Sequence, residues 1–208
     1  MTIWSWYKDR PIHMRRVCIF LAKFNSNWFF EHLDIRKQLT LAHSKQNAEH
    51  IASYIGDDAS RFEQLISIFL GEDDRLCQRS AMAVSKCVDR YPSLLAPHLE
   101  KIILNLQGPV TVAVKRNSVR VLQTVEIPED LLGIAAEILF GIMENRQESI
   151  AVRVFTMTVL YNICVRIPEL SNELKLIIED QMPYGSTGYR NRGAKTIARL
   201  EQLIKLTE

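Results

Sequence analysis

The fold is decided by the stretch DRLCQRSAMAVSKCVDRYP at residues 74–92, which is followed by SLLAPHLEKIILNLQG at residues 93–108. The apolar side chains of the first part step by four, three and four residues, and this spacing places them on one face of an α-helix. They are Cys77, Ala81, Val84 and Val88. Pro92 cannot continue that helix, but its fixed backbone angle suits the first turn of the next. The stretch therefore predicts two helices joined at a proline.

The same unit recurs twice further along the chain. The first recurrence is PVTVAVKRNSVRVLQTVEIP at residues 109–128, followed by EDLLGIAAEILFGIMEN at 129–145. The second is QESIAVRVFTMTVLYNICVRIP at 147–168, followed by ELSNELKLIIEDQMPYG at 169–185. Strict alternation of apolar and polar residues over the length of a strand is missing from these stretches, so each unit predicts helix, turn and helix. The turns are marked by prolines 36 and 40 residues apart: Pro92, Pro128 and Pro168.

Related patterns flank the three units. Upstream, an apolar stripe stops at Gly56, and SRFE at residues 60–63 has the pattern of a capping box that opens a helix over 62–70. Downstream, residues 187–206 are expected to form one last helix. The upstream stripe consists of Ile35, Leu39, Ala42, Ile51 and Ile55.

A repeat of helical hairpins at this period is an architecture in its own right. One hairpin cannot bury its apolar face alone, whereas a stack of hairpins makes a continuous core. From about residue 34 to the end, the chain resembles HEAT-like (armadillo-type) helical repeat proteins. The resemblance implies an all-α fold, a right-handed α-solenoid of stacked antiparallel hairpins. The expected boundaries of the repeat domain 34–208 are hairpins 34–71, 72–108, 109–145 and 146–185, then a final helix 187–206.

Residues 1–33 do not fit the repeat. They hold all three tryptophans, Trp4, Trp6 and Trp28, together with several other aromatic residues. One interpretation is a capping helix that covers the first hairpin's apolar face. The alternatives are an aromatic-rich extension without fixed structure, an upstream stretch that the native protein does not use, or an anchor at a membrane surface.

Composition limits the class of partner. The formal net charge of +2 is far from the strongly basic balance of a dedicated nucleic-acid binder. The charge is uneven, because residues 1–31 and 186–208 each carry five Lys and Arg against two Asp and Glu. Four cysteines form no CxxC pair and have no zinc-ligand spacing, which predicts buried thiols, a cytoplasmic location and no structural metal.

Basic residues that recur in successive units are the best functional candidates. Arg79, Arg116, Arg153 and Arg192 are 37, 37 and 39 residues apart, so a stack would bring them into line. One interpretation is structural, with each guanidinium bonded to a neighbouring carbonyl or carboxylate. The other is a basic ridge that contacts phosphates or an acidic protein surface. The candidate partner-binding residues are Arg79, Lys115, Arg116, Asn117, Arg120, Arg153, Tyr189, Arg190, Arg192 and Lys195.

No motif in the sequence identifies a catalytic or cofactor site. GYRNRGAKT at residues 188–196 resembles a phosphate-binding loop, but Ala194 separates the second glycine from the lysine. His43 and His50 are two helical turns apart and lack a third metal ligand nearby. We therefore predict a non-catalytic scaffold for a protein partner, with a concave surface lined by the second helices. The alternative is nucleic-acid binding through the basic ridge, as in HEAT-like alkylpurine glycosylases, and an enzyme with a dispersed site is a third hypothesis.

Overall fold

The computed structural model describes residues 33–207, and every regular element in that range is a helix. Our predictions for residues 1–33 therefore fall almost wholly outside the described residues. Short 3-10 helices at Pro92–His98, Pro168–Leu170 and Met182–Tyr184 join some of the α-helices. The α-helices are α3 (Ile35–Leu41), α4 (Lys45–Ile55), α5 (Ala59–Phe69), α6 (Asp74–Arg90), α7 (Leu99–Asn105), α8 (Val112–Leu122), α9 (Glu129–Glu144), α10 (Ile150–Cys164), α11 (Ser171–Gln181) and α12 (Thr187–Thr207).

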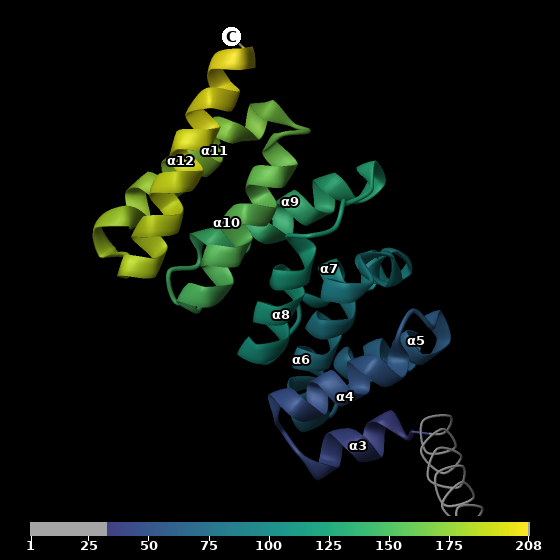
Figure 1. Ribbon diagram of the computed structural model, residues 1–208. Helices are drawn as coiled ribbons and strands as arrows, with labels where there is room; N and C mark the ends of the chain where they lie inside the picture. Colours follow the sequence, from purple (N-terminus) through teal and green to yellow (C-terminus); the bar gives the residue numbers. More distant parts are fainter. Residues whose placement is uncertain (1–32, 208) are drawn as a thin grey trace, which may run out of the picture.

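The helices form two layers (Figure 1). Helices α4, α6, α8, α10 and α12 pack one against the next, and we call them the first-helix layer. Helices α5, α7, α9 and α11, together with the 3-10 helix at Pro92–His98, cover one side of that layer, and we call them the second-helix layer. The short helix α3 packs on α4, α5 and α6 at the start of the stack. The predicted all-α solenoid of stacked hairpins is confirmed.

Prolines and polar caps define where the helices begin. Pro92 and Pro168 open 3-10 helices, and Pro128 immediately precedes α9, as the spacing of the units predicts. In the first-helix layer, a side chain at the N-cap accepts a hydrogen bond from a backbone N–H of the first turn. These caps are Ser44 for α4, Asp73 for α6, Thr111 for α8 and Ser149 for α10.

The structure corrects the expected start of α5. The predicted capping box would open the helix at Ser60, but the N-cap is Asp58. Its carboxylate accepts hydrogen bonds from the backbone N–H groups of Ser60 and Arg61, at 2.9 and 3.0 Å. Aspartate and serine are equally good N-cap residues, and Asp58 precedes Ser60 in the chain, so the helix begins earlier than predicted.

The upstream stripe is split between two helices. α3 ends at Leu41, Ala42 is extended and exposed, and α4 begins at Lys45. The break is held by Asn47, whose side-chain amide donates to the carbonyls of Gln38 and Ala42, at 3.0 and 2.8 Å. These hydrogen bonds join α4 to carbonyls that have no intrahelical partner at the end of α3. The spacing of apolar residues does not predict them.

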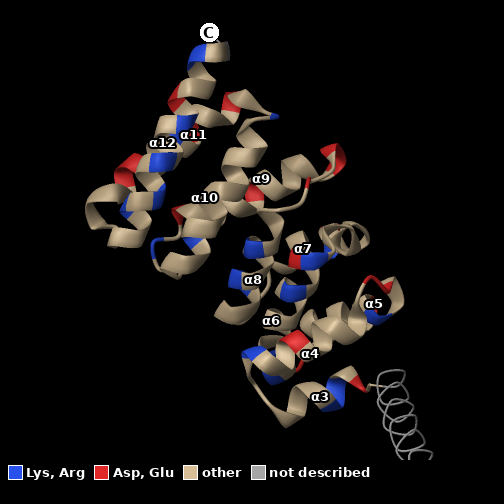
Figure 2. Cartoon of the chain, viewed as in Figure 1, with Lys and Arg blue, Asp and Glu red and all other residues tan. Residues whose placement is uncertain are grey.

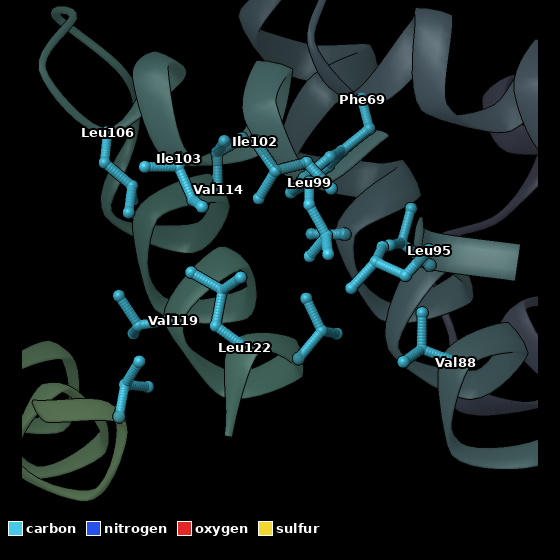
Figure 3. Close-up of a cluster of buried hydrophobic side chains, with 14 of the residues drawn as sticks. Phe69, Val88, Leu95, Leu99, Ile102, Ile103, Leu106, Val114, Val119 and Leu122 are labelled. Atoms are coloured by element: carbon cyan, nitrogen blue, oxygen red, sulfur yellow. The ribbon is translucent and has the colours of Figure 1, made fainter. Parts of the chain in front are cut away.

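The core runs continuously between the layers. Figure 3 shows part of it, where side chains from α6, α7 and α8 meet, and Val88, Leu95 and Leu122 there are fully buried. The expected burial of cysteine is confirmed for Cys77, Cys87 and Cys164, which are free thiols. Burial raises the pKa of the Cys87 thiol to about 12, so it remains protonated at physiological pH.

Two glycines weaken α9 without a packing reason. A Cβ added at Gly133 or Gly141 would meet nothing within 4 Å. We expect Gly133→Ala and Gly141→Ala each to raise the free energy of unfolding by about 0.5–1 kcal/mol, because alanine loses less backbone entropy in a helix. Urea denaturation measures the change.

Gly193 in α12 is the matched control. A Cβ there would lie 2.8 Å from Met182 Sδ and 3.0 Å from Ile178 Cγ2, where α12 packs on α11. Gly193→Ala is expected to lower stability by about 1–3 kcal/mol through overpacking. If all three variants changed stability in the same direction, this account of the glycines would be wrong.

Candidate interaction surface

Several of the predicted basic residues bind other parts of the chain. The Arg79 guanidinium donates to the carbonyls of Leu39 and Thr40 at the end of α3, at 3.0 and 2.8 Å. Arg120 on α8 contacts Asp89 on α6, with the closest nitrogen and oxygen 2.9 Å apart. Of these two, Arg79 is one of the recurring arginines, and its contact is the kind that the structural interpretation describes, a guanidinium bonded to a neighbouring carbonyl.

Lys115 makes the most shielded of these ion pairs. Its Nζ lies 2.7 Å from Glu148 Oε2, and the Glu148 side chain is only 8% exposed. Glu148 also accepts a hydrogen bond from the backbone N–H of Ser149, the N-cap of α10. The pair thereby fixes the start of α10 against α8, and the Lys115 ammonium is engaged within the chain.

Two candidates are buried and do not belong to the surface. Asn117 accepts a hydrogen bond from Ser85 Oγ at 2.8 Å and donates to the Ala113 carbonyl, which links α8 to α6. Tyr189 has no exposed surface, and burial raises its pKa to about 12. A partner cannot reach either side chain, so our expectation that they bind one is corrected.

Tyr189 and Arg153 instead meet at Gln181, the last residue of α11. Gln181 Oε1 accepts from Arg153 at 2.7 Å and from the Tyr189 hydroxyl at 2.9 Å. Its amide nitrogen donates to the Met143 carbonyl at 2.7 Å. Arg153 also lies over the Tyr189 ring, 5.0 Å from its centroid. One buried amide therefore ties α9, α10, α11 and α12 together.

Arginines that contact aromatic rings remain at the surface. Arg116 of α8 lies over the Phe155 ring at 5.8 Å, and Arg199 of α12 lies over the Tyr161 ring at 3.8 Å. Between them, Arg192 of α12 donates to Thr158 Oγ1 at 2.8 Å. All three contacted residues are on α10. We call this surface the α10 face, defined by Arg116, Phe155, Thr158, Tyr161, Arg192 and Arg199.

The helix at the centre of this face is apolar around most of its circumference. One side of α10 is buried in the core, through Val152, Val159 and Leu160 among others. On the outer side Phe155 and Tyr161 are half-buried, and Val165 at its end is 51% exposed. Its only charged residue is Arg153. α10 packs against α8, α9 and α12, and Phe155 and Tyr161 also pack in part against the core, so this outer side is only partly open to solvent.

The remaining two candidates lie on different sides of α12. Lys195 is exposed and is three residues from Arg192 and four from Arg199, so it lies on the same side of the helix as the α10 face. Arg190 is also exposed, but it is two residues from Arg192, about 200° around the helix. It lies on the side of Glu201, which pairs with Lys175 of α11. The predicted residues therefore do not form a single ridge.

Charge is divided between the layers. Helices of the first-helix layer carry 14 Lys and Arg against 4 Asp and Glu, whereas those of the second-helix layer carry 3 against 9. Figure 2 shows basic segments on α8 and α12 and acidic segments on α9. In the first half of the stack, Glu49 and Asp89 compensate basic side chains of the first-helix layer. The six residues that define the α10 face include three arginines and no carboxylate, so this face carries a net positive charge.

Four members of this face were missed by the sequence analysis: Phe155, Thr158, Tyr161 and Arg199. A signal for the three on α10 was present, because residues 150–164 are nearly free of charge on every side of the predicted helix. Arg199 is seven residues after Arg192, two helical turns along α12, and that spacing places both on one side. The repeat period relates Arg192 to Arg153 but does not relate it to Arg199.

Metal-binding groups and surface depressions were the other places where chemistry could be expected. Among the described residues, none of the His, Cys, Asp and Glu side chains gather in a group of three that could hold a metal ion. A depression of about 540 Å³ beside α4 contains one carboxylate, Glu49, which is already paired with Lys86 and Arg90. Between residues 33 and 207, none of the helices combines the length and the apolar character needed to cross a bilayer.

Comparison with known proteins gives one match. A family model described as HEAT repeat domain matches residues 35–192, from the start of α3 into α12. The match spans the α10 face except for Lys195 beside it and Arg199. No curated protein and no solved structure matches the chain.

The buried amide of Gln181 provides a test of how the last two repeats are joined. Gln181→Leu keeps a similar volume but leaves the Arg153, Tyr189 and Met143 polar groups without their partner. We expect a loss of about 2–4 kcal/mol in the free energy of unfolding, whereas Tyr189→Phe removes one donor and costs about 1 kcal/mol. Urea denaturation of both variants checks the order, and a larger cost for Tyr189→Phe would contradict it.

Proposed function

The chain belongs to the HEAT repeat domain family, and from that premise we propose that it is a non-catalytic scaffold that binds a protein partner through the α10 face. Stacked helical repeats present extended surfaces, and proteins built from them commonly use those surfaces for binding. The observation that carries the proposal is the outer side of α10, where half-buried Phe155 and Tyr161 pack in part against the core and each has an arginine beside its ring.

The composition of this face supports a protein partner. Aromatic residues and arginine are the residue types enriched where protein interfaces gain most of their affinity. Phe155 and Tyr161 supply the aromatic part, and exposed Val165 extends the apolar surface along α10. Arg116 and Arg199 stand on either side, which resembles an apolar centre with a polar rim.

The arginines of the face are held in place with most of their donors unused. A guanidinium over an aromatic ring is oriented by the ring face, and it keeps its N–H groups for other partners. Arg120, in contrast, donates hydrogen bonds to both carboxylate oxygens of Asp89. Arg116 and Arg199 are therefore pre-organised to receive a carboxylate or a phosphate, and pre-organisation lowers the entropy cost of binding.

This proposal places the docking surface on the first-helix layer, whereas the sequence led us to expect the second helices. Helix α9 of the second-helix layer lacks a comparable combination. On the outward side of α9 the residues between its acidic positions include Gly133 and Gly141, which add no side chain for a partner to contact. The first-helix layer offers both apolar area and charge, and we therefore favour it.

Nucleic-acid binding is the second candidate function. Arginine beside exposed aromatic rings also suits single strands, whose bases stack on rings and guanidinium planes. The broad ridge proposed from the sequence has less support, because Arg79, Lys115 and Arg120 are engaged within the chain. Four basic side chains remain around α10: Arg116, Arg192, Lys195 and Arg199.

A photo-crosslinking amino acid at Thr158, in the centre of the α10 face, tests the protein-binding function. We expect a specific covalent adduct with another protein in native cells, and its loss when Arg116→Glu and Arg199→Glu are added, because both changes reverse charge beside the probe. The same probe at Glu137, on the outward side of α9, is the matched control. Equal adducts from both positions, or none from Thr158, would count against the proposal.

Fluorescence anisotropy of labelled oligonucleotides separates the second candidate from the first. With about four available cations, we expect single-strand binding at low salt that disappears near physiological salt, since each phosphate contact on a single strand adds about 0.7 to the salt slope. Arg116→Ala with Arg199→Ala should lower the slope by about 1.4, and Lys101→Ala on α7 should leave it unchanged. Tight binding to a single strand at physiological salt would instead establish nucleic-acid binding.

A further inference from the structure

The outward side of α11 carries the complement of the α10 face. Leu176 points away from the core and is 65% exposed, while Leu174 and Ile178 of the same helix are fully buried. Glu173 and Glu179 are three residues before and after it, and Asp180 is four after, so all lie on the same side of α11. We call Glu173, Leu176, Glu179 and Asp180 the α11 face. It is an apolar side chain set among carboxylates.

The two faces match in spacing as well as in charge. On α10, the rings of Phe155 and Tyr161 each contact an arginine. The two residues are six positions apart, about 9 Å along a helix, and Thr158 lies midway between them. On α11, Glu173 and Glu179 are also six residues apart, with Leu176 midway. Laid against each other at this spacing, the helices would bring a carboxylate toward each arginine and the leucine opposite Thr158, to which Arg192 donates.

We propose that the α10 face of one copy of this chain binds the α11 face of a second copy. The inference goes beyond the proposed function, because it needs no other protein. Unused guanidinium donors of Arg116 and Arg199 would receive the carboxylates of Glu173 and Glu179. Of the acidic residues on the α11 face, Asp180 already pairs with Arg146, and the Glu179 pair with Lys175 is long at 3.8 Å.

The placement of the faces determines the kind of assembly. α10 belongs to the first-helix layer and α11 to the second, and their outward sides face opposite directions, so one chain can use both faces at once. A contact between two different faces is heterologous and extends from copy to copy unless the rotation closes a ring. The contact does not produce a closed dimer with two-fold symmetry.

The net charge of the chain does not oppose this association. The whole chain has a formal net charge of only +2, so repulsion between copies is small. The attraction depends on exposed side chains, and salt screens it over a Debye length of about 10 Å at 0.1 M. Association is therefore expected to grow with protein concentration and to weaken as salt rises.

Sedimentation velocity on the full chain, with one variant of each face, tests the proposal. The α10-face variant carries Arg116→Ala and Arg199→Ala, which remove charge without reversing it, and the α11-face variant carries Glu173→Lys and Leu176→Lys. Wild-type protein at low salt should form species larger than a dimer, and each variant alone should be monomeric. An equal mixture of the two should form a dimer and nothing larger, because each variant keeps one working face. Lys101→Glu, on α7, should behave as wild type.

Three results of this sedimentation experiment would contradict the proposal. A monomeric wild type at low salt and high concentration would overturn the proposal, as would a wild type that stops at a dimer or a mixture that stays monomeric. Far-ultraviolet circular dichroism and thermal melting establish that each variant is folded. The crosslinking experiment with the probe at Thr158 also separates self-association from the proposed function. A second copy of this chain gives an adduct of twice the chain mass, whereas a different protein gives an adduct of another mass. Each adduct can therefore be present or absent independently of the other.

Discussion

A helical hairpin cannot bury both of its apolar sides, and the rest of this structure depends on that constraint. α6 is covered by α4 on one side and α8 on the other, and α10 lies in the same way between α8 and α12. The second-helix layer closes the remaining side and completes a core in which residues such as Phe62, Leu95 and Leu139 are fully buried. Each repeat is thus stabilised by its neighbours more than by its own contacts.

Polar contacts between repeats determine how neighbouring helices are aligned more than they add to the free energy of unfolding. Arg120 with Asp89 is an exposed pair, and such pairs contribute little, about 0–1 kcal/mol. The buried contacts differ, because Ser85 with Asn117 and the amide of Gln181 satisfy polar groups of residues that are at most 9% exposed. Removing one partner there leaves the other unsatisfied, so these contacts favour one arrangement of neighbouring helices over a shifted one.

The sequence was sufficient for features that depend on local pattern. Periodic apolar residues and the prolines at Pro92, Pro128 and Pro168 predicted the helices and their joints, because both act within one turn of the chain. It was insufficient where the deciding partner is distant. Asn117 looked like a surface residue until its partner Ser85, 32 positions away, placed it in the interior. The break at Ala42 depends on Asn47 in the same way, and apolar spacing does not report it.

The α10 face arises from a conflict that the fold alone does not resolve. The outer side of α10 carries apolar side chains that are only half-buried, and exposed apolar surface favours aggregation unless something covers it. Here the guanidinium carbons of Arg116 and Arg199 lie 5.8 and 3.8 Å from the ring centroids of Phe155 and Tyr161. A guanidinium beside a ring face still has N–H groups that water can reach, so both arginines add polar surface to the half-buried rings. The contact that makes these rings tolerable in water is therefore also the one on which the proposed binding of an acidic partner depends.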